Sequence, residues 1–74
     1  MLKISKIEYL KDYLVHCRFN DGIEKTIDLS VLLSKPVFNI LSDKSIFKKF
    51  TNKNYFIEWE NYDLDLSADT LFHL

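Results

Sequence analysis

The densest group of side chains that could do chemistry is Asp63-Leu64-Asp65-Leu66-Ser67-Ala68-Asp69. Its Asp-x-Asp-x-Ser opening is typical of a calcium-binding loop, in which oxygen ligands alternate along the chain. Such a loop also needs a glycine at its sixth position and a glutamate at its twelfth, where this chain has Ala68 and Leu74. The pattern therefore argues against a metal site.

Two other interpretations of this segment stay open. In the first, Asp63 and Asp65 form the wet face of a short strand, and Ser67 caps a helix with Asp69 in its first turn. In the second, the acidic residues meet a basic partner, because complementary charge raises encounter rates and specificity. The candidate partner surface of this second interpretation consists of Glu58, Glu60, Asp63 and Asp65.

The other reactive side chains form no catalytic set. We expect His16 on the outer face of a strand and His73 near the end of the chain, and neither has zinc-ligand partners at suitable spacing. The single cysteine, Cys17, is expected on the inner face of the same strand, as a buried and inert thiol. A single glycine excludes a glycine-rich phosphate loop. We therefore expect no enzymatic activity, no cofactor and no metal.

The charge balance gives little support to a nucleic-acid surface. The net charge is −1 and the isoelectric point is about 6.0, whereas nucleic-acid-binding domains usually carry a basic stripe. The Lys44–Lys53 stretch holds four lysines and precedes an aromatic strand that contains Trp59, but acidic residues surround that strand. A nucleic-acid-binding regulator using these lysines is the alternative function.

The expected location is the cytoplasm. No signal peptide is visible, and no apolar run approaches the length that spans a membrane. One cysteine cannot form an internal disulfide, which suits a reducing compartment.

The chain is organised around a predicted hairpin with the loop Asn20-Asp21-Gly22. Apolar and polar residues alternate on both sides of this loop, which is the period of half-buried strands. A two-residue loop would place Phe19 opposite Glu24 and mix the two faces. A three-residue loop gives the pairs Phe19–Ile23, Val15–Ile27 and Arg18–Glu24. We therefore predict a type I turn with Gly22 left-handed in a bulge, and Lys25 as the exception on the apolar side.

The elements before residue 43 are predicted from spacing and caps. Residues 3–9 form a first strand with a bulge between Ile4 and Ile7, and this strand and the hairpin make an antiparallel meander. Ser30 or Ser34 caps a short helical turn. Pro36 occupies a first helical position.

The second half of the chain is predicted in the same way. Ser42 caps a short helix with an apolar stripe, and residues 51–54 form a polar turn. A strand over 55–59 and a short strand that includes Leu64 and Leu66 make a C-terminal hairpin, and a short helix over 68–72 follows. Residues 1–74 are thus expected to form one α+β domain: a three-stranded antiparallel meander, short helices, a C-terminal β-hairpin and a short terminal helix.

Spaced motifs along the chain match those of one known family. They are Phe19, Asp21 and Gly22 as F-x-D-G; Asp28, Leu29 and Leu33 as D-L-x-x-x-L; Pro36, Val37, Phe38 and Leu41 as P-V-F-x-x-L; Phe47 in the next helix; Trp59, Asp63, Asp65 and Ser67 as W-x-x-x-D-x-D-x-S; and Leu71 as a closing leucine. Over roughly residues 3–73 the chain resembles the bacterial domain-of-unknown-function family 2442 (DUF2442). Glu60-Asn61-Tyr62 stands where other branches have Pro-Asn-Gly.

The resemblance implies the same small α+β fold and no enzymatic activity. It also implies a protein-interaction role, because some members lie beside another small protein in pairs that look like toxin–antitoxin modules. From this resemblance we expect an antitoxin-like module that binds a small protein encoded by a neighbouring gene. The sequence leaves open whether the chain also forms a homo-oligomer.

Overall fold

The structure, a computed structural model, describes residues 1–74. Its fold consists of two three-stranded antiparallel sheets and several short helices. The first sheet has the order β1-β2-β3, and the second has the order β4-β5-β6. The strands are β1 (Ile4–Lys11), β2 (Leu14–Phe19), β3 (Glu24–Asp28), β4 (Thr51–Asn52), β5 (Phe56–Trp59) and β6 (Leu64–Ser67). The helices are the 3-10 helices η1 (Leu29–Leu32), η2 (Pro36–Ser42) and η3 (Glu60–Tyr62), and the α-helices α1 (Lys44–Phe47) and α2 (Ala68–Phe72). The α+β class and the N-terminal meander are confirmed.

The β2–β3 hairpin has the predicted register. Val15 lies opposite Ile27, and the Phe19 N–H donates to the Ile23 carbonyl at 2.9 Å. The Gly22 N–H closes the turn on the Phe19 carbonyl at 3.0 Å, and Gly22 has φ +89°. That backbone angle favours glycine, so the only glycine of the chain is used where the loop needs it. Ile23, the last residue of the predicted apolar face, is only partly covered, since it is 46 % exposed.

The predicted irregularity of the first strand is also confirmed. The pairing of β1 with β2 shifts between Ile4 and Lys6, and a second shift falls between Tyr9 and Lys11. Each shift changes which residues of the strand face inward and interrupts the ladder only at one unpaired residue, Ser5 or Leu10. Ile4 is fully buried, and Ile7 and Tyr9 pack against the core.

The helical segment between the sheets differs from the prediction in its caps. Asp28, rather than Ser30 or Ser34, caps η1 by accepting from the Ser30 N–H at 2.9 Å. Asp43, rather than Ser42, caps α1 by accepting from the Ser45 N–H at 2.9 Å. An aspartate accepts these bonds as well as a serine does, so the residue type alone cannot decide which position caps the helix. Hydrogen bonds from Ser30 and Ser45 lower the pKa of the two capping carboxyls.

The second sheet contains a strand where the sequence predicted a turn. Thr51–Asn52 is β4, which pairs with β5, so the C-terminal hairpin of β5 and β6 has a third strand beside it. Two polar residues carry no periodic signal, and β4 is fixed instead by contact with β1. The Ile4 N–H donates to the Asn54 carbonyl at 2.6 Å, and the Asn52 amide donates to the Ile4 carbonyl at 3.2 Å. These bonds join the two sheets.

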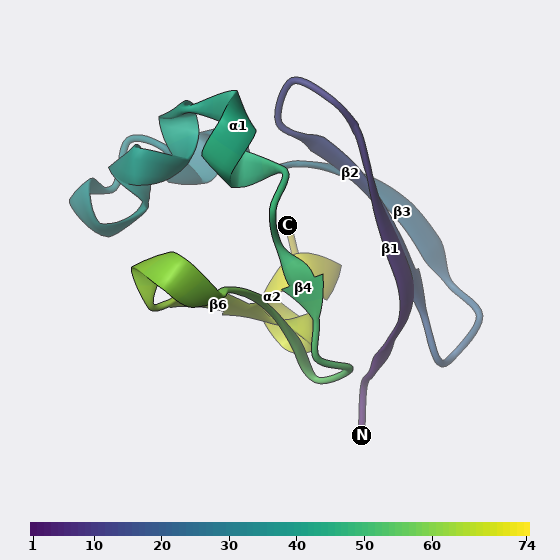
Figure 1. Ribbon diagram of the computed structural model, residues 1–74. Helices are drawn as coiled ribbons and strands as arrows, with labels where there is room; N and C mark the ends of the chain where they lie inside the picture. The colour runs from purple at the N-terminus through teal and green to yellow at the C-terminus, as the bar shows by residue number, and fades with distance from the viewer.

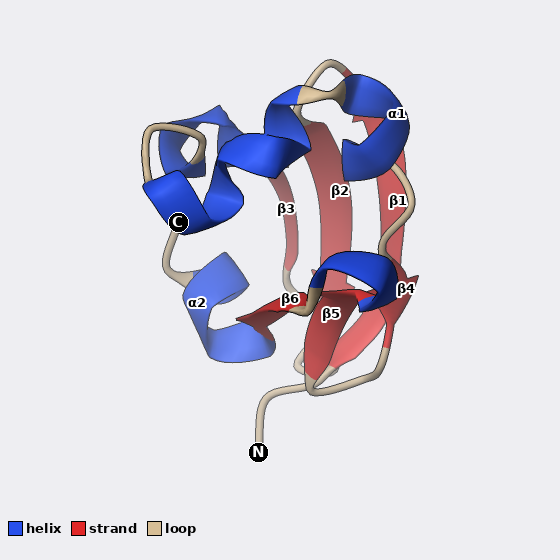
Figure 2. Cartoon of the chain, turned by 60° about the vertical axis from the view of Figure 1, so that its left-hand side comes forward, coloured by secondary structure: helices blue, strands red, loops and turns tan.

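One continuous core lies between the sheets and the helices. Figure 1 shows the first sheet on one side of the molecule and the second sheet and helices against a single face of it, and Figure 2 shows the helices gathered over that face. The buried residues are all apolar: Ile4, Val15, Cys17, Phe19, Ile27, Leu29, Leu32, Leu41, Phe47, Ile57, Trp59, Leu64, Leu66, Ala68 and Leu71. At its centre the Trp59 indole N–H donates to the Phe47 carbonyl at 2.7 Å. This bond ties the second sheet to α1.

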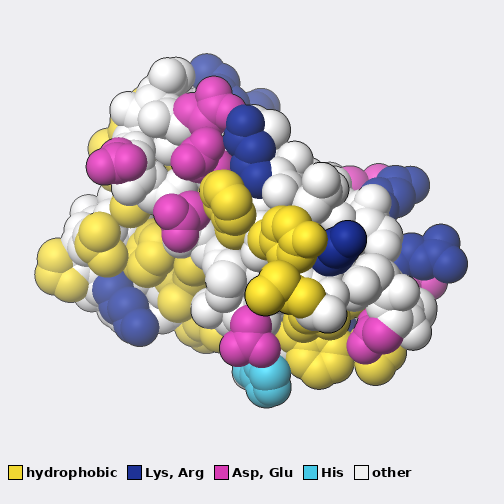
Figure 3. All heavy atoms as spheres, turned by 90° about the horizontal axis from the view of Figure 1, so that it is seen from below, with side chains coloured by type: hydrophobic (Ala, Val, Ile, Leu, Met, Phe, Trp, Pro, Cys, Tyr) yellow, Lys and Arg dark blue, Asp and Glu magenta, His cyan; other side chains and the backbone are white.

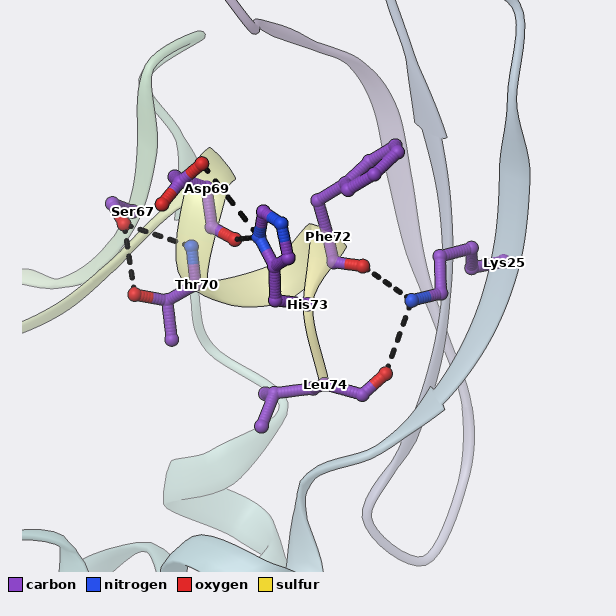
Figure 4. Close-up of polar contacts among 7 residues, drawn as sticks. All are labelled: Lys25, Ser67, Asp69, Thr70, Phe72, His73 and Leu74. Carbon is purple, nitrogen blue, oxygen red and sulfur yellow. Dashed lines mark hydrogen bonds and ion pairs between the residues drawn. The ribbon is translucent and has the colours of Figure 1, made fainter.

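Lys25, the exception on the apolar face, has a structural role that the sequence did not reveal. Its ammonium donates to the main-chain oxygens of Phe72 and Leu74 and lies 5.5 Å from the centre of the Phe72 ring (Figure 4). A cation stabilises the unpaired carbonyls at the C-terminal end of a helix. Lys25 thus holds the end of α2 against the first sheet.

Candidate protein-interaction surface

The outer face of the second sheet carries two of the four residues of the predicted partner surface, Glu58 and Asp65. Along β5, Ile57 and Trp59 are buried, so Phe56 and Glu58 point to the other face. Along β6, Leu64 and Leu66 are buried, whereas Asp65 and Ser67 are exposed. The strict alternation of both strands is what separates an apolar inner face from this polar outer face.

Glu58 and Asp65 are directly opposite each other on neighbouring strands. The Ala68 N–H donates to the Tyr55 carbonyl at 2.8 Å, which fixes the alternation of the ladder. Glu58 and Asp65 therefore form a non-hydrogen-bonded pair, the geometry in which opposite side chains come closest. No cation forms an ion pair with either carboxylate. Like charges directly opposite each other destabilise a sheet.

The other two predicted residues are placed differently. Glu60 begins η3 and forms an ion pair with Lys53 at 2.9 Å, and this contact raises the pKa of Lys53. Asp63 ends η3 in a left-handed conformation with φ +55°, directly before β6. Glu58 and Asp65 are thus brought together, Glu60 is already paired, and Asp63 lies at the turn between them.

Figure 3 views the molecule from below, the side on which the second sheet lies in Figure 1. Acidic side chains gather at the upper left of this view, and basic and hydrophobic side chains are exposed beside them. We call Glu58, Asp63 and Asp65, together with the neighbouring half-buried Phe56, the acidic face. An acidic surface with an aromatic neighbour is suited to a partner that is basic and partly apolar.

The structure shows no set of side chains that could bind a metal ion at the Asp63–Asp69 segment. No three His, Cys, Asp or Glu side chains lie close enough together to hold a metal ion. Ser67 caps α2 as predicted, with its hydroxyl accepting from the Thr70 N–H at 3.0 Å and donating to the Thr70 hydroxyl at 2.9 Å (Figure 4). His73 contacts the main-chain oxygen of Asp69 at 2.8 Å and its carboxylate at 3.7 Å. The serine and the histidine of this short helix are therefore each bonded to other residues.

Two of the four lysines proposed for nucleic-acid binding already form ion pairs within the chain. Lys44 forms an ion pair with Asp12 at 3.0 Å, which raises the pKa of Lys44, and Lys53 is paired with Glu60. Lys48 and Lys49 are exposed. The stretch thus offers fewer free cations than its composition indicates.

An apolar ridge on η2 was not foreseen. In a 3-10 helix, residues three apart are eclipsed, so Val37 and Ile40 share one side of η2. Val37 is 62 % exposed and Ile40 is 46 % exposed, while Phe38 and Leu41 on the next side pack inward. A spacing of exactly three could have identified this ridge if a 3-10 helix, rather than an α-helix, had been expected.

Two shallow grooves lie elsewhere on the surface. One is polar and is lined by residues that include Lys49, Trp59 and Glu60. The other is mostly apolar and is lined by Met1, Leu2, Tyr55 and the start of α2. Ser67 and Asp69 both line the second groove, but the Ser67 hydroxyl bonds to Thr70 rather than to the Asp69 carboxylate.

The remaining motif residues have structural positions. Phe19 and Trp59 are in the core, Asp21 accepts from the Ile23 N–H at 3.0 Å in the hairpin loop beside Gly22, Asp28 and Ser67 are helix caps, and Pro36 opens η2. No helix is both long and apolar enough to cross a membrane.

Comparison with known proteins identifies one family. Neither the curated proteins nor the solved structures contain a match to this chain. The model of one protein family, described as "Protein of unknown function (DUF2442)", matches residues 4–74. That range includes both sheets and every helix. With the hairpin, the proline-started 3-10 helix and the Trp59 strand all inside the match, the chain belongs to the DUF2442 family.

Proposed function

We propose that this chain is a non-catalytic protein-interaction module that binds a small basic protein through its acidic face. The antitoxin-like role, with a partner encoded by a neighbouring gene, is part of the proposal and comes from the family resemblance. The nature of the surface comes from the charges on β5 and β6.

The observation that carries the proposal is the Glu58–Asp65 pair. The two residues lie directly opposite each other and neither carboxylate forms an ion pair, so their repulsion is offset only in part, by the charge of Lys53, which is itself paired with Glu60. A lysine or arginine of a partner would convert this repulsion into attraction. The charge would also steer a basic partner toward the surface and slow the approach of acidic proteins.

The non-catalytic part of the proposal is supported by how the reactive side chains are used. The Cys17 thiol is buried, and burial raises its pKa to about 11, so it is not a thiolate at neutral pH. Ser67 is bonded to Thr70, and no base lies next to its hydroxyl. Cys17 is thus inert, and Ser67 is engaged in capping.

Affinity purification tests the proposal. The tagged chain is recovered from its native host, and the proteins that accompany it are identified by mass spectrometry. We expect a small basic protein in stoichiometric amount. Asp65→Lys should reduce its recovery at least about tenfold, which corresponds to about 1.4 kcal/mol. The matched control is Glu8→Lys, an exposed change of the same charge on the first sheet.

Besides recovery of no partner protein at all, two results would contradict the proposal. One is recovery of a partner that is equally reduced by Asp65→Lys and Glu8→Lys, since net charge rather than the acidic face would then be responsible. The other is recovery of nucleic acid without any protein. In that case binding that weakens steeply with salt and depends on Lys48 and Lys49 would establish the alternative function.

A further inference from the structure

The second sheet has one joined edge and one open edge. On the β4 side, the Asn52 side chain and the Asn54 carbonyl bond to Ile4 of the first sheet. On the β6 side, the strand pairs with β5 alone. The two edges therefore differ in what they offer to another chain.

The ladder alternation identifies the free groups of the β6 edge. Leu64 and Leu66 bond to β5, so the main-chain groups of Asp65 and Ser67 point away from it. The Asp65 N–H, the Asp65 carbonyl and the Ser67 N–H have no hydrogen-bond partner in the protein. The Ser67 carbonyl belongs to the first turn of α2. An edge of this kind is a template for an added strand.

We propose that a β-strand of the basic partner adds to the free edge of β6. This inference rests on the proposed function and specifies its binding mode. The main-chain groups of Asp65 and Ser67 supply the hydrogen bonds, as in other cases of strand addition. A lysine or arginine of the added strand lies beside Asp65 on the acidic face, and alternate apolar residues continue the inner face of Leu64 and Leu66.

The charge of this edge argues against a second copy of the chain as the added strand. A twofold pairing of β6 with itself, centred on Asp65, would place Asp65 opposite its own copy. The Asp63 carboxylates of the two copies would add further repulsion. A basic strand meets the same edge with attraction, so the acidic residues select the partner and discourage self-association.

Amide hydrogen exchange measured by NMR on the full ¹⁵N-labelled chain tests the inference. The probes are two short capped peptides, one alternating Lys with Val and the other alternating Glu with Val. With the Lys–Val peptide we expect the Asp65 and Ser67 amides to exchange about tenfold more slowly, because they become hydrogen-bonded. The Glu–Val peptide should give no protection. Asp65→Lys should abolish the effect and Glu8→Lys should not.

Several outcomes would overturn the edge assignment. They are protection of Thr26 on the free edge of β3 in place of Asp65, equal protection by the two peptides, and no protection by either. The proposed function is tested separately by partner recovery. If the partner is recovered and depends on Asp65 while the Asp65 and Ser67 amides stay unprotected in that complex, the acidic face binds it without strand addition. If no partner is recovered at all, the proposed function itself fails.

Discussion

The two sheets each have three antiparallel strands, but the charged side chains on their outer faces are paired differently. On the first sheet, Arg18 lies opposite Lys6 on one side and Glu24 on the other, and His16 bonds to the same glutamate at 2.9 Å, so Glu24 offsets the like charges of Lys6 and Arg18. The hydrogen bond from His16 lowers the pKa of Glu24. On the second sheet, Glu58 lies opposite Asp65 with no cation between them.

The difference indicates which outer face serves the free chain. On the first sheet, a carboxylate of the chain itself, Glu24, compensates the like charges of Lys6 and Arg18 without any partner. The like-charge pair of the second sheet has no such explanation, and a basic partner would supply one. The predictions below test whether the sheets are joined as described and whether their outer faces differ in the way proposed.

The largest expected loss of stability follows from a substitution in the core that the two sheets share. Trp59→Ala removes a buried indole and its bond to the Phe47 carbonyl, and should lower the free energy of unfolding by about 3–5 kcal/mol. Thermal unfolding followed by circular dichroism measures the loss. Because both sheets share one core, the β2 amides should lose exchange protection together with those of β5. Retained protection in β2 alone would show that the sheets fold independently.

The second largest expected effect is a loss of stability at alkaline pH, caused by the buried Cys17 thiol on the inner face of the first sheet. The folded-state pKa of Cys17 is about 11, above the ordinary value of 9.0, so folding favours the neutral thiol. Its contribution is fully present below pH 9 and is lost as the pH rises from 9 to 11, at a cost of roughly 2–3 kcal/mol. Denaturant unfolding across this range should show a steeper decline for the native chain than for Cys17→Ala. Parallel declines would mean that other groups cause the alkaline loss.

A smaller effect concerns the link between β3 and α2. Lys25→Met keeps the apolar stem but removes the ammonium that binds the Phe72 and Leu74 oxygens, and should cost about 1–2 kcal/mol. Exchange of the His73 and Leu74 amides should accelerate more than exchange within β2. Lys48→Met, an exposed change of the same kind, should alter stability by no more than about 0.5 kcal/mol. Equal effects of the two variants would remove the capping role.

The smallest expected effects have opposite signs on the two sheets. Asp65→Asn relieves the like-charge pair and should raise the free energy of unfolding by roughly 0.2–1 kcal/mol. Glu24→Gln removes a complementary partner of Arg18 and His16 and should lower the melting temperature. Matched thermal melts at low salt give both signs. A change of the same sign in both variants would contradict the contrast between the outer faces.

Periodic and glycine-marked features of the chain were predictable. The Asn20-Asp21-Gly22 loop fixed the hairpin register, because a slip by one residue would have exposed the apolar set. The alternation of Leu64 and Leu66 with aspartates predicted β6, and Ser67 was recognised as the cap of α2. These features depend on local patterns that few alternative structures satisfy.

Some missed features are local, such as the caps Asp28 and Asp43, where serine and aspartate compete for the same role. The others depend on contacts between distant segments. β4 is a strand because Thr51 and Asn52 pair with β5, and Asn52 and Asn54 next to it bond to Ile4 of the first sheet; no local pattern signals these contacts. The role of Lys25 depends on α2, which lies more than forty residues along the chain. For the candidate site, the sequence suggested the acidic residues, and that suggestion stays a prediction. The ion pair of Glu60 and the free edge beside Asp65 required the structure.

The most direct test of the central claim is the recovery of the partner protein with Asp65→Asn. This variant removes one charge from the acidic face and should leave the fold at least as stable as the native chain. The account predicts that a more stable protein captures several-fold less partner. Undiminished capture by a stably folded Asp65→Asn would contradict the claim that the acidic face of the second sheet is the binding surface.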